Sequence, residues 1–159
     1  MITTILLFLA GGNVQGGVDI LAQSRSGKVL CANPDGAAKS CSSITSFNLI
    51  SDGSIIETTE VLLTPDPVLT LTMSIGTKVS GDSACGVMTL DDLRRGQVRL
   101  NGKAIPSDRN ALVLKRLEAS MAALAGKQVC DAIRYENNGL VKYGQIDGVD
   151  IKLPGKPII

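Results

Sequence analysis

The sequence predicts an α+β domain: a mostly antiparallel sheet with one long helix packed on one face and a short second helix. Three observations predict this fold class. Alternating polar and apolar residues, typical of half-buried strands, dominate both ends of the chain. Residues 108–125 form the one long stretch whose apolar side chains recur at helical spacing. Strands and helices do not alternate regularly, as a parallel sheet would require.

The first 22 residues predict a signal peptide that is cleaved after Ala22. Residues 2–10 form an apolar run of the length that export signals use, and this run is too short to span a membrane as a helix. No lysine or arginine precedes Arg25, although such signals usually begin with a basic residue. The alternative is that residues 2–9 form a buried first strand. We expect export, with residues 23–159 forming a single domain.

Strands are expected next along the chain. Residues 42–50 and 55–64 read as a hairpin around Asp52-Gly53, a pair that favours tight turns. The second strand ends at Pro65-Asp66-Pro67, because proline cannot donate to a strand ladder. Residues 68–81 then alternate with a period of two and predict a third strand.

Two helices and a hairpin follow. Thr89 is expected to cap a short helix that Gly96 ends. Asn101-Gly102 predicts a type I′ hairpin, since both residues tolerate positive φ angles. Ser107 is expected to cap the long helix, and Gly126 to end it in the left-handed conformation.

The chain closes with a predicted meander. Residues 127–136, 140–146 and 149–153 read as three strands joined by turns at Asn137-Asn138-Gly139 and Asp147-Gly148. The tail, residues 154–159, carries two prolines and is expected to lie as an extended edge.

The four cysteines predict two disulfides. Cys31, Cys41, Cys85 and Cys130 lie too far apart in sequence for the paired ligands of a structural zinc site or for a thioredoxin-type redox pair. An even number of cysteines in a small exported domain is typical of structural disulfides. Of the three possible pairings we favour Cys31–Cys41 with Cys85–Cys130, because the first pair encloses a compact loop and the second flanks the long helix. The alternative is four reduced, buried thiols in a cytosolic protein.

Candidate catalytic groups are few. The chain contains no histidine, so the commonest general base and metal ligand are missing. Glu57 and Glu60 are three residues apart in one strand and should lie on opposite faces. Asp91 and Asp92 suit the start of a helix. Asp147 and Asp150 bracket a hairpin turn. No catalytic, cofactor-binding or metal-binding residue is therefore assigned, and no cofactor is expected.

The composition limits the classes of partner that this protein is expected to bind. A net charge of +1 with 3% aromatic residues does not favour nucleic-acid binding, which needs basic stripes and stacking platforms. We expect a small periplasmic or secreted protein, more a binding or accessory protein than an enzyme, acting on a protein partner as an inhibitor or immunity-like protein would. The alternatives are a histidine-free hydrolase that uses two carboxylates and a cytosolic domain with reduced cysteines.

Overall fold

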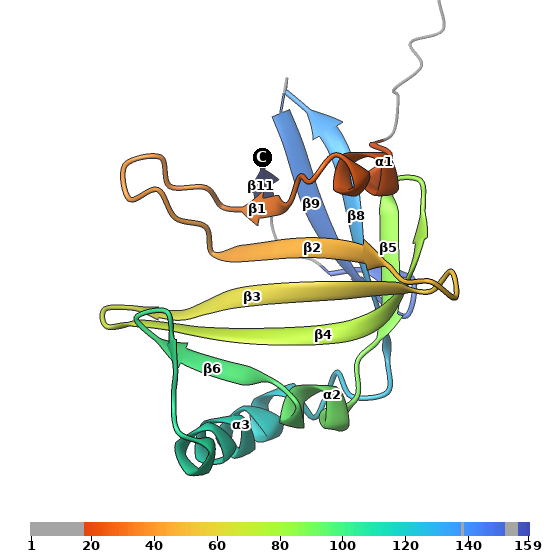
Figure 1. Ribbon diagram of the computed structural model, residues 1–159. Helices are drawn as coiled ribbons and strands as arrows, with labels where there is room; N and C mark the ends of the chain where they lie inside the picture. Colours follow the sequence, from red (N-terminus) through yellow and green to blue (C-terminus); the bar gives the residue numbers. More distant parts are fainter. Residues whose placement is uncertain (1–17, 138, 152–155) are drawn as a thin grey trace, which may run out of the picture.

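The part of the protein that the structure describes is built mainly from antiparallel strands, with three short helices (Figure 1). The computed structural model describes residues 18–137, 139–151 and 156–159. The helices are α1 (Ile20–Arg25), α2 (Leu90–Arg94) and α3 (Ser107–Met121). The strands are β1 (Leu30–Ala32), β2 (Ser43–Leu49), β3 (Ile55–Pro65), β4 (Val68–Ser80), β5 (Ser83–Val87), β6 (Gln97–Leu100), β7 (Lys103–Ala104), β8 (Gln128–Glu136), β9 (Gly139–Ile146), β10 (Val149–Asp150) and β11 (Lys156–Ile158).

The sheet closes on itself. Strands β1 to β5 pair in chain order, β5 pairs with β8, β8 with β9, β9 with β11, and β11 returns to β1. Every pairing in this ring is antiparallel. The ring encloses a common interior, while β6 and β7 continue from β4 outside it and β10 adds to β9.

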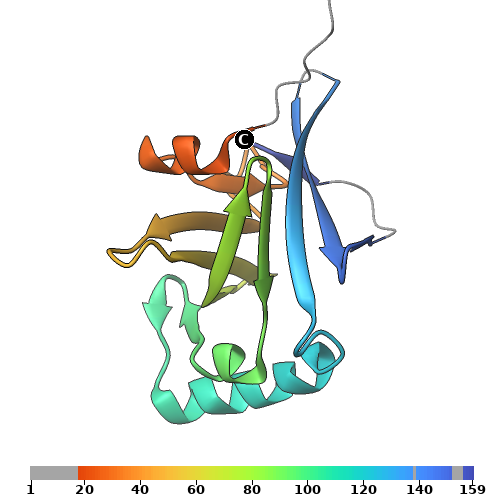
Figure 2. The ribbon, with the colours of Figure 1, turned by 90° about the vertical axis from the view of Figure 1, so that its right-hand side faces the viewer.

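Helices cover the two ends of the ring, as Figure 2 shows with α1 at one end and α3 at the other. Two groups of buried side chains match this arrangement. The group beside α1 consists of Val18, Ile20, Ala32, Phe47, Ile55, Ala84 and Ile133. The group beside α2 and α3 consists of Leu71, Leu93, Val98 and Leu114.

The predicted fold class is wrong. The protein is mostly antiparallel β-structure, with α3 the only helix of seven or more residues in the described part of the chain, and it is not an α+β domain with a long helix on one face. The physical reason is that a closed sheet buries its own inner face, so no open face is left for a helix to cover. The helix predicted for residues 108–125 covers an end of the ring instead, through Leu114.

The ends of α3 also differ from the expectation. The helix begins at Ser107 after Pro106, and no side chain caps its first turn. It ends at Met121, four residues early, although Gly126 does adopt the predicted left-handed conformation with φ of 78°. The tail differs too, because β11 pairs with both β9 and β1 and is not an edge.

Local turn and capping signals are confirmed. Asn101 and Gly102 both have positive φ, 49° and 77°, as a type I′ hairpin requires. Thr89 caps α2 and forms a reciprocal capping box with Asp92. These features depend on a few neighbouring residues, so the sequence alone is enough to predict them.

The start of the described chain belongs to the core. Val18 and Ile20 are only 7% and 3% exposed, and the Ile20 amide donates to the carbonyl of Gly81. Asp19 caps α1 by accepting from the amide of Ala22. Cleavage after Ala22 stays a prediction, and it would remove both buried side chains. The alternative first strand, residues 2–9, lies outside the described residues.

A chain that begins at Gln23 is expected to unfold with a free energy about 3 kcal/mol lower than one that begins at Val18, because each buried aliphatic side chain contributes roughly 1.5 kcal/mol or more. Urea unfolding of the two purified chains under oxidising conditions measures the difference. A full-length chain with Val18→Ser and Ile20→Ser is the control and should reproduce the loss. Equal stability of the two truncated chains would show that α1 contributes nothing to the core.

Candidate functional site

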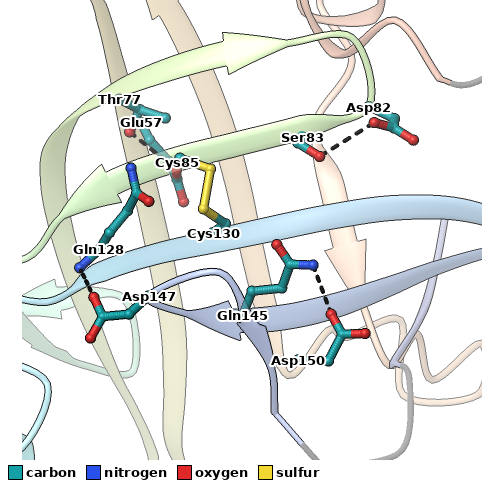
Figure 3. The surroundings of a disulfide bond; sticks show 10 residues. All are labelled: Glu57, Thr77, Asp82, Ser83, Cys85, Gln128, Cys130, Gln145, Asp147 and Asp150. Carbon is teal, nitrogen blue, oxygen red and sulfur yellow. Dashed lines mark hydrogen bonds between the residues drawn. A yellow bond between two sulfur atoms is a disulfide. The ribbon is translucent and has the colours of Figure 1, made fainter.

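Two disulfides brace the sheet. Cys31 at β1 is bonded to Cys41 just before β2, with their Cα atoms 5.4 Å apart. Cys85 and Cys130 lie directly opposite each other on β5 and β8, with Cα atoms 4.0 Å apart (Figure 3). These are the two pairs favoured from the sequence. Two disulfides within one chain indicate an oxidising location, extracellular or periplasmic.

The polar groups near Cys85–Cys130 have structural partners (Figure 3). Asp147, in the β9–β10 turn, accepts from the backbone amide of Gln128 at 3.0 Å. Asp150 accepts from the side chain of Gln145 at 2.7 Å. Asp147 and Asp150 therefore hold the turn and the strand pair together and do not converge on a catalytic arrangement.

A polar cluster lies inside the ring. Glu57 on β3 faces inward, where its carboxylate accepts hydrogen bonds from the hydroxyls of Thr59 and Thr77, both at 3.3 Å. Thr59 in turn contacts the hydroxyl of buried Thr45 at 3.0 Å. Glu60 lies on the outer face of the same strand, so the prediction that the two glutamates face opposite sides is confirmed.

An ion pair belongs to the same cluster. Nζ of Lys142 on β9 lies 2.6 Å from Oδ2 of Asp131 on β8, and their side chains are 13% and 22% exposed. Burial raises the pKa of Glu57, and the negative charge of Asp131 raises it further. The charge of Lys142 and the threonine hydroxyls lower it, but they do not offset the burial. This interior cluster thus contains two carboxylates and one ammonium group.

Sequence reasoning missed Asp131 and Lys142. Each lies in a strand, two positions from an apolar residue. Ile133 follows Asp131 by two positions, and Leu140 precedes Lys142 by two positions. Since residues two apart share a face, this pattern places both charges on the inner face. A charged residue within the apolar face of a strand was the signal that could have identified the pair.

Glu57→Gln is expected to raise the free energy of unfolding at pH 7.5 but not at pH 4. Because the folded protein raises this pKa above its unfolded value, the contribution of Glu57 to stability is fully present below pH 4.5 and is lost as the pH rises through the folded pKa. The neutral amide escapes that loss. Urea unfolding from pH 4 to 8 measures the difference, with Glu60→Gln as the control for removing one negative charge. A gain that is independent of pH would contradict the assignment.

An apolar groove lies on the outer face of β2, β3 and β4. It has a volume of about 370 Å³ and is lined by Ala38, Ser40, Cys41, Ile44, Glu60, Leu62, Pro65, Val68 and Thr70. Ile44 and Val68 are 40% and 43% exposed, which is high for large aliphatic side chains. We call this the outer groove; its volume is within the range of ligand-binding pockets.

A braced loop forms one wall of the outer groove. Residues 33–41 and the β3–β4 hairpin project to the same side of the molecule, at the left of Figure 1. Asp35 accepts from the amides of Ala37 and Ala38, both at 2.9 Å, and forms a bridge with Ser40. The Cys31–Cys41 disulfide at the base of this loop further restrains it above the sheet.

The interior carboxylates do not line the outer groove, and the two smaller cavities beside α1, of about 20 and 230 Å³, are lined by neither of them. Within the described ranges, no three His, Cys, Asp or Glu side chains are grouped to hold a metal ion. Nor does that part of the chain contain a helix long and apolar enough to cross a membrane. The outer groove is therefore the candidate site, and the interior cluster is a feature of the core.

Comparison with known proteins identifies no relative. No family model matches the chain, and no curated protein or solved structure matches it at a significant level. The candidate site is therefore assigned from its geometry alone. It is an apolar outer groove that contains one carboxylate and is bordered by a disulfide-bonded loop.

Proposed function

We propose that this chain is an exported, non-catalytic binding protein that engages a protein partner through the outer groove. The observation that carries the proposal is the open apolar surface of Ile44, Leu62 and Val68 beneath a disulfide-braced loop. Aliphatic side chains exposed together on a folded surface favour contact with another macromolecule.

The rigidity of the site supports binding. A wall that is already held in position loses little conformational freedom when a partner docks, so more of the contact energy becomes affinity. Strands β2 and β3 provide the floor, and their pairing is continuous from Ser43–Val61 to Leu49–Ile55. An inhibitor or immunity-like protein would use such a surface to cover a region of its target.

The two alternatives have less support. A carboxylate-based hydrolase needs two carboxylates on either side of a substrate cleft. Glu57 and Asp131 face the interior of the ring, whereas the outer groove contains a single carboxylate, Glu60. A cytosolic protein with reduced cysteines fits poorly with two formed disulfides.

Site-specific photo-crosslinking tests the proposal. The full chain is expressed with a photoreactive amino acid at Ile44, or at Val149, which is 69% exposed and remote in sequence, as the control. We expect one protein adduct from position 44, none from position 149, and loss of the adduct when Leu62→Ser is added. The intact mass of the same preparation shows whether the chain has been cleaved on export. Alkylation shows whether the cysteines are oxidised. The same adducts from both positions would overturn the proposal.

A further inference from the structure

The groove contains one ionisable side chain, the carboxylate of Glu60. In the register of the sheet Glu60 lies between Ile44 on β2 and Thr72 on β4, with Leu62 two residues along β3 on the same face. None of the ion pairs found among the described residues includes Glu60. Its side chain is only partly buried, so the carboxylate is open to water.

Any apolar group that fills the groove removes this water. Taking a carboxylate out of water without a compensating charge carries a large penalty. A partner that contacted Ile44 and Leu62 with aliphatic groups alone would lose much of its binding energy to this cost. A cation placed next to Glu60 compensates for it, and the apolar surroundings strengthen the attraction by lowering the local dielectric.

We propose that the outer groove recognises a polypeptide segment in which an aliphatic side chain stands next to a lysine or arginine. This inference rests on the proposed function and adds the chemistry of the partner to it. The aliphatic side chain packs on Ile44, Leu62 and Val68, and the cation pairs with Glu60. The groove volume of about 370 Å³ is small, so the recognised segment is a short one.

Selection from a phage-displayed library of random seven-residue peptides tests the inference. The probe is the library itself, panned on the full oxidised chain, and the enriched peptides are then synthesised and titrated by calorimetry. We expect enrichment of an aliphatic residue adjacent to lysine or arginine. Both Leu62→Ser and Glu60→Gln should weaken binding at least tenfold, whereas Val149→Ser and Asp108→Asn, the matched apolar and acidic controls elsewhere on the surface, should not.

The outcomes separate the two claims. Peptides that lose affinity with Leu62→Ser but not with Glu60→Gln would overturn the requirement for a cation and leave the groove as a binding site. Peptides that are indifferent to both variants, or a selection without specific binders, would overturn the cation requirement and the proposed function together. Added salt gives a further check, since pairing with Glu60 should weaken as the ionic strength rises.

Discussion

Replacing Cys85 and Cys130 together by alanine is expected to lower the free energy of unfolding by about 4 kcal/mol, because the bond closes a loop of 45 residues in the unfolded chain. The loop contains α2, β6, β7 and α3, all of which leave the ring between β5 and β8. Without the bond, the unfolded chain gains the freedom to separate these two strands. A loss of this size is a large part of the stability of a domain of this length.

The other disulfide provides the matched control. Cys31 and Cys41 are separated by 10 residues, so the same reasoning predicts a loss of about 3 kcal/mol for their joint replacement by alanine. Urea unfolding of both variants, with alkylation to verify that the remaining pair is bonded, measures the difference. A loss below 1 kcal/mol for the Cys85–Cys130 variant would contradict this prediction. It would show that the disulfide adds little to the stability that the pairing of β5 with β8 already provides.

The two disulfides also have different relations to the candidate site. Cys41 lines the outer groove, whereas Cys85 and Cys130 lie on other strands. Removing the Cys31–Cys41 bond should therefore weaken binding through greater freedom of the loop, beyond its effect on stability. Removing the Cys85–Cys130 bond should change stability without altering the walls of the groove.

The sequence predicted local features well. The longer strands, the Asn101-Gly102 hairpin and the capping of α2 each depend on residues a few positions apart. The strand predicted for residues 149–153 is shorter, Val149–Asp150, and residues 152 and 153 lie outside the described part of the chain. Closure of the sheet could not be predicted in this way, since it depends on β11 pairing with β1 across most of the chain. Without closure, a long amphipathic helix implies an open face to cover, and this assumption produced the incorrect fold class.

The sequence pattern also does not distinguish the inner face of β3 from its outer face. One alternating set along this strand is Ile55, Glu57, Thr59 and Val61, and the other is Ile56, Thr58, Glu60 and Leu62. Each set contains one glutamate, one threonine and two aliphatic residues. The pattern therefore predicts a strand but not which glutamate is buried, and both the interior cluster and the outer groove depend on that choice.

The second large effect on stability is expected from the interior cluster. Lys142→Met is expected to lower the free energy of unfolding by about 3–5 kcal/mol at neutral pH, because it leaves Asp131 without its partner inside the ring. Removing Lys142 also removes the charge that favours the ionised form of Glu57, so the two buried carboxylates then repel each other without a compensating cation. Lys78→Met, at an exposed position of β4, is the control for the loss of one lysine and should have little effect.

A double replacement identifies the cause. Lys142→Met combined with Asp131→Asn removes the unpaired charge, so it should be more stable than Lys142→Met alone even though it carries two substitutions in the core. Such recovery is the signature of a coupled pair in a double-mutant cycle. Additive losses would instead show that the two side chains contribute only by packing. The ion pair between Lys142 and Asp131 would then contribute no electrostatic free energy to the stability of the fold.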